Sequence, residues 1–311
     1  FPQLVAGPIV QWRYIQGQFE NRTIRLPAAA AGLRRFIIGL AKKILLADVL
    51  AVVADTAFAG AGPSLRAPLA WYGAIAYTLQ VYLDFSGYSD MALGMGRMFG
   101  FSFPENFRLP FRADSLRDFW RRWHMTLTRW FREYLYIPLG GSLGSTVRKV
   151  RNLAVVFLFT GLWHGAIWTF ILWGMWHGLF VVLDHIRVLK PSKWPAVVRH
   201  LYTALVVILG FVLFRADSVT HAVRFLCGMF SFGALDAMQA SVLAELCAPL
   251  YICTLVIAGM VSLHQPRLRD FSLPARRWLA LGRDILCVCL LVCSYASMVS
   301  GNYHPFIYFR F

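Results

Sequence analysis

The sequence is poor in charged residues. Of its 311 residues, 15% are charged and 58% are hydrophobic, whereas soluble domains carry about 25% charged residues. This composition excludes an ordinary soluble domain and predicts a membrane protein. Acidic residues are the scarcest, with 15 Asp and Glu against 31 Lys and Arg. The basic residues cluster at the ends of apolar segments, as in cytoplasmic loops, so we expect lipid contact and no nucleic-acid partner.

Several motifs are also absent. None of the six cysteines forms a Cys-x-x-Cys pair, which disfavours a disulfide framework and a metal site. The sequence has no Walker loop and no Gly-rich dinucleotide fingerprint, so ATP hydrolysis and NAD chemistry lose support, and we expect no bound cofactor. It begins with Phe1 and not with Met. We interpret it as a chain without its N-terminal part or as a shortened homologue.

Long hydrophobic runs are abundant. Segments of about 17–25 apolar residues can cross a bilayer as helices, and we expect them at roughly 36–59, 69–95, 197–214, 243–264 and 280–300. The stretch 152–183 has no Lys, Arg, Asp or Glu and is too long for one perpendicular crossing. Four glycines offer places to break it into two helices or half-helices lining a cavity: Gly161, Gly165, Gly174 and Gly178. The fold predicted is an all-α polytopic bundle.

The segment 117–134 predicts an amphipathic helix. On a helical wheel its apolar face carries Trp120, Trp123, Leu127, Trp130, Phe131 and Tyr134. The opposite face carries Arg121, Arg122, Arg129 and Arg132. Such a helix lies in the membrane interface or re-enters the membrane. The arginines between 108 and 132 place this loop in the cytoplasm by the positive-inside rule.

Two Trp-His-Gly triplets, at 163–165 and 176–178, stand inside the uncharged stretch. A neutral imidazole can accept a hydroxyl proton, and an apolar environment favours the uncharged ring. His164 is therefore either a general base or a structural histidine bonded to a backbone carbonyl. His177 would lie on a different face of a continuous helix, which favours a packing role. His124 lies at the boundary of the amphipathic helix, where a histidine alone can simply snorkel.

Charged residues inside apolar segments offer a second set of candidates. Asp84 and Asp90 lie in "YLDFSGYSDMALG", where they either orient a partner or pair with an arginine. Lys42 and Lys43 either pair with Asp48 or snorkel to the interface. The residues alone do not choose between these alternatives.

Several blocks of sequence resemble one family. They are "FPQLVAGPIVQW" at 1–12, "LDFSGYSDMALGMGRMFGF" at 83–101, "NFRLPFRADSLRDFWRRWHMTLTRWFREYLYIPLGG" at 106–141, "TGLWHGAIWTFILWGMWHG" at 160–178 and "HPFIYFRF" at 304–311. Together they resemble the membrane-bound O-acyltransferases, in the branch of alginate O-acetyltransferase and the teichoic-acid D-alanyl transfer protein. The two terminal blocks favour the alginate-type branch.

The resemblance implies a single transmembrane domain over 1–311, built as a helical bundle around a funnel, without the helices that precede the first block in the family. It maps the family's invariant histidine onto His164 and its more variable His or Asn position onto His124. His164 would activate an acceptor hydroxyl, and His124 would hold or polarise the acyl donor. The substrate-binding residues implied are Arg121, Arg122, Trp123, Trp163 and Asp84.

The activity implied is transfer of acetyl groups across the bacterial inner membrane for O-acetylation of an exported, alginate-like polysaccharide. A cytoplasmic thioester such as acetyl-CoA or an acyl-carrier protein would be the donor, and a periplasmic esterase-like (SGNH-type) acetyltransferase would complete the transfer. Three alternatives stay open: transfer of D-alanyl or another acyl group, a non-catalytic truncated homologue, and a transporter with a His and Asp proton relay.

Overall fold

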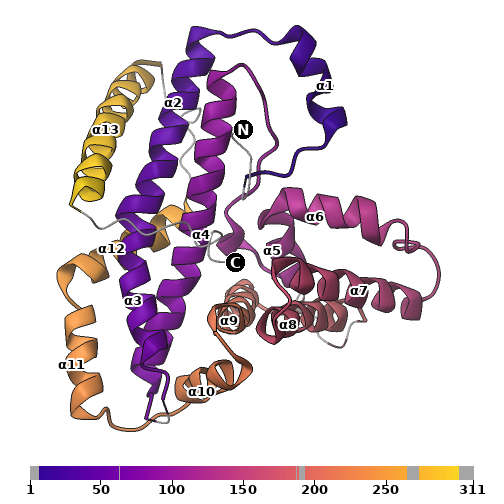
Figure 1. The fold of residues 1–311 in the computed structure, drawn as a ribbon, viewed down its shortest axis with the longest axis vertical. Helices are drawn as coiled ribbons and strands as arrows, with labels where there is room; N and C mark the ends of the chain where they lie inside the picture. Colours follow the sequence, from indigo (N-terminus) through magenta and orange to yellow (C-terminus); the bar gives the residue numbers. More distant parts are fainter. Residues whose placement is uncertain (1–6, 63, 187, 189–192, 265–272, 301–311) are drawn as a thin grey trace.

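The computed structural model describes residues 7–62, 64–186, 188, 193–264 and 273–300, and every regular element in these ranges is a helix (Figure 1). The all-helical prediction is therefore confirmed for the described part of the chain. The terminal block at 304–311 and the first six residues of the block at 1–12 lie outside the described residues.

Two long helices form the spine of the molecule. The first runs without a break through α2 (Leu26–Ala41), the π-helical segment η1 (Lys42–Ala47) and α3 (Asp48–Ala59). It returns as α4 (Ala67–Met98), which lies beside it along its length (Figure 1). These helices contain the predicted apolar segments 36–59 and 69–95. The backbones meet closely, because a Cβ built on a glycine of α2, Gly39, would lie only 2.5 Å from a carbonyl oxygen of α4.

The predicted single helix over 117–134 is two helices in the structure. They are α5 (Leu116–Arg122) and α6 (Met125–Phe131), followed by the π-helical turn η3 (Arg132–Tyr136). The chain breaks at His124, whose φ of 42° and ψ of 52° are left-handed. A continuous-helix wheel therefore gives a wrong description of this segment.

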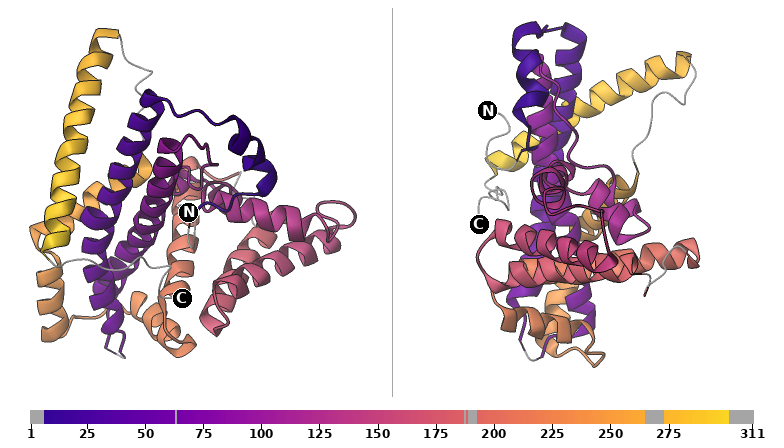
Figure 2. Two further views of the ribbon diagram at one scale, coloured as in Figure 1. Left: turned by 45° about the horizontal axis from the view of Figure 1, so that its top comes forward. Right: turned by 90° about the vertical axis from the view of Figure 1, so that its right-hand side faces the viewer.

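The uncharged stretch forms two helices, as its glycines predict. These are α7 (Thr146–His164) and α8 (Trp168–His185), which pack side by side to one side of the spine (Figures 1 and 2). The break comes at Gly165, whose φ of 155° is rarely adopted by other residues. Gly161 and Gly174 lie inside the helices. Their role is close packing, because a Cβ on Gly174 would lie 2.3 Å from the carbonyl oxygen of Phe157.

The remaining helices surround this framework. They are α1 (Trp12–Asn21), the 3-10 turn η2 (Pro110–Arg112), α9 (Ala196–Arg215), α10 (Val219–Met229), α11 (Ala237–Leu246), α12 (Pro249–Leu263) and α13 (Leu273–Val299). Among the described residues, α9 and the segment Trp278–Val299 are long and apolar enough to cross a membrane. The pair α11 and α12, bent by 62°, is a third candidate if it forms one broken span.

One hydrophobic core connects the spine to the lateral helices. At one end Phe58 of α3 stacks on Phe225 of α10, with ring centroids 3.9 Å apart. At the other end Trp123, in the α5–α6 break, packs on Phe211 of α9 with centroids 5.1 Å apart. The core thus holds the break between α5 and α6 against α4 and α9, next to the end of α7.

Candidate active site

The structure brings the two predicted catalytic histidines to one cavity. His124 enters it from the break between α5 and α6, and His164 from the last turn of α7. The cavity has a volume of about 60 Å³. Its lining consists of Trp120, Trp123, His124, Leu127, Thr128, Phe131, Val156, Phe157, Thr160 and His164. Two imidazoles are therefore the ionisable side chains of an otherwise largely apolar pocket.

His124 is held by both its backbone and its ring. Its left-handed conformation is uncommon for a residue other than glycine, although His, Asn and Asp adopt it more readily than most. The ring is buried, with Nδ1 3.0 Å from Oδ1 of Asn106. The edge of the ring also meets the ring of Phe85 on α4, with centroids 4.7 Å apart. Strained backbone that the surroundings enforce is typical of functional sites.

His164 is the last helical residue of α7, before the break at Gly165. Its ring meets Trp173 and Phe214 edge to face, with centroid distances of 5.0 and 5.1 Å. Trp163 lies 4.8 Å from the His164 ring and 6.1 Å from the His124 ring, centroid to centroid. The predicted site residue Trp163 therefore contacts both histidines, although it is itself 47% exposed.

The three predicted site residues next to His124 take different positions. Trp123 is buried and lines the cavity. Arg122 does not line it and pairs instead with Asp118, one turn earlier, at 2.7 Å. Arg121 is exposed on the outside of α5. A role for the two arginines in binding the donor stays a prediction.

Asp84, predicted to bind substrate, is placed elsewhere. It is buried between η1 and α4, where it pairs with Lys43 at 2.8 Å, and Lys43 also pairs with Asp48 at 2.7 Å. The buried ammonium group of Lys43 explains this position of Asp84, because a buried cation requires carboxylates nearby to compensate its charge. Asp84 thus forms an ion pair, and its partner is a lysine where an arginine was expected. A role in binding substrate stays a prediction.

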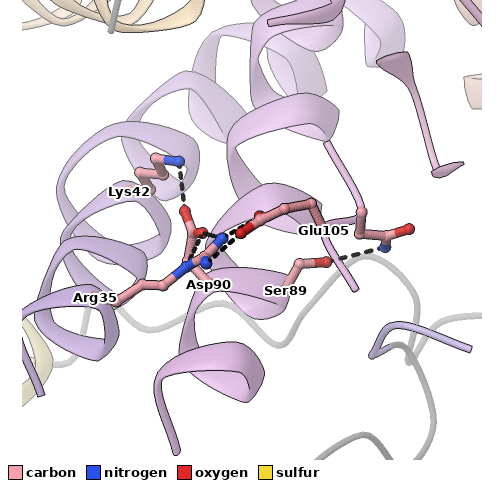
Figure 3. Close-up of polar contacts among 6 residues, drawn as sticks. Arg35, Lys42, Ser89, Asp90 and Glu105 are labelled. Carbon is pink, nitrogen blue, oxygen red and sulfur yellow. Dashed lines mark hydrogen bonds and ion pairs between the residues drawn. The ribbon is translucent and has the colours of Figure 1, made fainter. Parts of the chain in front are cut away.

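Asp90 belongs to a second ion cluster at the same helix interface, drawn in Figure 3. Its carboxylate accepts from Lys42 at 2.7 Å and from Arg35 at 2.8 Å. Arg35 also binds Glu105, with one contact of 2.7 Å. These charges join α2 to α4 and to the loop that leads to Asn106. The cluster stabilises the surroundings of the site without lining the cavity.

His177 does not line the cavity. It is wholly buried on α8, packed against Trp120 and Trp173 with centroid distances of 5.1 and 5.4 Å. Neither of its ring nitrogens has a hydrogen-bond partner among the described residues. This position agrees with the packing role that its place in the sequence favours. The His177 ring is linked to the site through Trp173, whose ring contacts both His164 and His177.

Asn106 is the site residue that the sequence analysis missed. It is completely buried in the loop before η2, and its side chain contacts His124, Thr126 and Ser89. Nothing in the local pattern marks it, because an asparagine between helices is typical of any turn. The only available signal was its place at the start of the block 106–141.

Comparison with known proteins identifies the family of this chain. Residues 1–220 match the MBOAT, membrane-bound O-acyltransferase family. The protein named Probable alginate O-acetylase AlgI from Pseudomonas putida is 40% identical over 336 residues, which cover 100% of this chain and 67% of the relative. The Peptidoglycan O-acetyltransferase of Helicobacter pylori is 41% identical over 248 residues, covering 78% of this chain and 47% of the relative.

A more distant relative is the Teichoic acid D-alanyltransferase of Bacillus subtilis, 26% identical over 247 residues that cover 71% of this chain and 60% of the relative. The chain belongs to the membrane-bound O-acyltransferase family. It is a membrane protein of the branch that contains the alginate O-acetylases, as its sequence blocks indicate. It spans about half of the length of most alginate-type relatives and two thirds of one.

Proposed function

We propose that this chain carries the reaction centre of a bacterial inner-membrane O-acetyltransferase that serves an exported polysaccharide. The observation that carries the proposal is the shared cavity of His124 and His164, in a chain of an acyl-transferring family. The names of the alginate-type relatives support a uronic-acid polymer as the final acceptor. The peptidoglycan relative supports a second candidate acceptor, another cell-envelope sugar polymer.

His164 is the proposed general base. It takes the proton of an acceptor hydroxyl while the hydroxyl oxygen attacks the carbonyl carbon of an acyl thioester. The new carbon–oxygen bond forms, the carbon–sulfur bond breaks, and the leaving thiolate takes up the proton from the imidazolium. General acid–base catalysis of this kind contributes about 10²–10⁴-fold to a rate.

The cavity favours a small, neutral acyl group. A water molecule needs about 10–15 Å³ of such space, so a cavity of about 60 Å³ accommodates a few heavy atoms, as in an acetyl group. A D-alanyl group carries an ammonium, and burying it without a carboxylate is costly. No Asp or Glu is among the residues that line the cavity. Acetyl transfer is therefore preferred over D-alanyl transfer.

The donor and the partner follow from the expected orientation. A coenzyme A or carrier-protein thioester would arrive from the cytoplasm, where Arg121 and Arg122 can bind its phosphate groups. The acetyl group would then pass to a periplasmic acetyltransferase of the esterase type, which completes the transfer to the polymer. These assignments rest on the basic character of the loop and on the branch of the family.

The decisive experiment is His164→Ala in the full-length protein, expressed in cells that make the polymer. Acetyl ester content should fall by about 10²–10⁴-fold, while the amount of protein in the membrane stays the same. The matched control is His200→Ala, since His200 is an exposed histidine on α9 whose ring contacts the carbonyl of Ala196 in its own helix. Acetyl content near the wild-type value in His164→Ala would reject the proposal.

A further inference from the structure

Asn106 completes the N-terminus of α6 from outside the helix. Its backbone carbonyl accepts the N–H of Met125 at 2.9 Å, and its side-chain Oδ1 accepts the N–H of Thr126 at 3.4 Å. These are the first two amides of α6, which have no partner within the helix. His124, which occupies the N-cap position, makes no side-chain capping bond. Asn106 therefore takes over the capping role and leaves the His124 ring available.

The same contacts fix the orientation of the Asn106 amide. A backbone N–H can only donate, so the amide atom that faces Thr126 is the carbonyl oxygen. The hydroxyl of Thr126 also donates to this oxygen at 2.9 Å, because an amide oxygen can only accept, and the Thr126 oxygen itself accepts the N–H of Ile9 at 3.1 Å. On the other side the Asn106 NH2 donates to Oγ of Ser89 at 3.1 Å; the Ser89 end of this contact is drawn in Figure 3.

The orientation of the amide decides where the His124 ring carries its hydrogen. Nδ1 of His124 lies 3.0 Å from the Asn106 carbonyl oxygen, which can only accept. Nδ1 must then be the protonated nitrogen, and in a neutral imidazole the other nitrogen, Nε2, has a free lone pair. We propose that Asn106 is a positioning residue that holds neutral His124 as the Nδ1–H tautomer and so presents Nε2 to the cavity as a hydrogen-bond acceptor.

This tautomer determines what His124 can contact. An accepting Nε2 pairs with a hydroxyl group and repels the carbonyl oxygen of a thioester, which also accepts. The partner of His124 in the cavity is thus a hydrogen-bond donor other than the hydroxyl whose proton His164 removes, either a second hydroxyl group of the acceptor or a water. Polarising the donor carbonyl, the role that the family resemblance implies, would need a hydrogen on Nε2. The inference rests on the proposed function only for the identity of this hydrogen-bond donor.

The tautomer can be measured directly by 15N NMR of the full-length protein labelled at histidine, in membranes and at a pH at which the ring is neutral. The signals of His124 are identified by their loss in His124→Asn. We expect Nδ1 to resonate as a protonated nitrogen and Nε2 as an unprotonated one. The reverse pattern in the wild-type protein would overturn the proposal, whether or not any variant folds.

Three variants separate positioning from a merely structural role. Asn106→Asp keeps an accepting oxygen at the same place, so the Nδ1–H pattern should persist. Asn106→Ala removes the acceptor, so the ring should populate the Nε2–H tautomer, and acetyl content should fall by about 10²-fold, the lower end of acid–base effects. Asn152→Ala is the matched control, because Asn152 is equally buried and its side chain contacts loop carbonyls and Arg151.

Each outcome has a definite meaning. An unchanged tautomer in Asn106→Ala, or an equal change in Asn152→Ala, would overturn the positioning role. Rescue by Asn106→Asp of both the tautomer and the activity would support it. Failure of the proposed function gives a different result from failure of the positioning role. In that case acetylation would survive His164→Ala, while the 15N NMR pattern of His124 would still show the Nδ1–H tautomer.

Discussion

The ammonium nitrogen of Lys43 lies 2.8 Å from Oδ1 of Asp84, inside the contact between η1 and α4. Both side chains are only 3% exposed, and the carboxylate of Asp48 completes the group at 2.7 Å from the same nitrogen. A buried ion pair contributes little compared with apolar residues of the same volume, but removing one partner leaves an uncompensated charge. The triad therefore makes the register of the two spine helices depend on all three charges.

We predict that Lys43→Ala destabilises the protein by about 3–5 kcal/mol, because the buried carboxylates of Asp84 and Asp48 lose the ammonium group they share. The measurement is SDS titration of the purified protein in micelles. The control is Asp217→Ala, because Asp217 is 81% exposed and its ion pairs should contribute no more than about 1 kcal/mol. A variant Asp84→Ala with normal stability but no acetylation would show that Asp84 binds substrate after all.

The packing of α7 on α8 predicts a second effect on stability and activity. An ideal Cβ on Gly174 would lie 2.3 Å from the carbonyl oxygen of Phe157 and 3.1 Å from the amide nitrogen of Gly161. Gly174→Ala should therefore push the helices apart, cost about 1–3 kcal/mol and displace His164 from the cavity. Acetyl content per folded protein and the SDS titration midpoint should both fall.

Gly259→Ala provides the matched control for this substitution. Gly259 also lies inside an apolar helix, α12, but no described atom outside its own stretch of helix lies within 4 Å of its ideal Cβ. There alanine should be neutral or stabilising by up to about 1 kcal/mol through helix propensity. Equal effects of the two substitutions would mean that the close contact between α7 and α8 is not what Gly174 provides.

The sequence pointed to both histidines that line the cavity, but not to Asn106, which joins His124 to Ser89 of α4. His164 stands out because it lies in an uncharged stretch, and His124 because its block resembles the family. Asn106 could not be identified, since its importance comes from amides of α6 that it meets only in the folded chain. The break at His124 was missed for the same reason, because a helical wheel assumes that every amide bonds within its own helix.

Helix existence was easier to predict than helix pairing. Apolar length and glycines located the spine helices and the division of 152–183 into α7 and α8. The partner of Asp84 depends on the register between η1 and α4, which hydrophobic periodicity does not specify. An arginine was expected, and the side chain that lies opposite is Lys43.

The loop between α4 and α7 should face the cytoplasm because of its arginines. Leu143 is a suitable place for a cysteine, since it is 77% exposed in the turn before α7. Ser115 is less suitable, because its hydroxyl caps α5 by accepting the N–H of Asp118. In a cysteine-free background, we expect Leu143→Cys to react with an impermeant thiol reagent in inverted vesicles and not in intact cells.

Phe232→Cys is the opposite-side control for this measurement. Phe232 is 82% exposed in the turn after α10, beyond the candidate span α9. The cysteine of Phe232→Cys should react with the reagent in cells whose outer membrane is permeabilised and whose inner membrane is closed. Labelling of Leu143→Cys from the outside, together with protection of Phe232→Cys, would reverse the orientation assigned to the site.

The last prediction separates the three buried histidines by replacing each with asparagine. His124→Asn is a mild change to the backbone, because asparagine tolerates the left-handed conformation found there. Its amide oxygen can also accept a hydrogen bond, although it cannot take a proton near pH 7. We therefore expect partial activity for His124→Asn, in keeping with an orienting contact to a second hydroxyl group of the acceptor or to a water.

His164→Asn should retain almost no activity, because the proposed base is lost and about 10²–10⁴-fold of the rate with it. His177→Asn should lie nearest to the wild type in activity per folded protein, since His177 is outside the cavity and packs behind its lining residue Trp120. The measurement is acetyl ester content of the exported polymer, normalised to the amount of each variant in the membrane. If His124→Asn folds normally and is as inactive as His164→Asn, the division of roles is wrong, and the two imidazoles act as one catalytic pair.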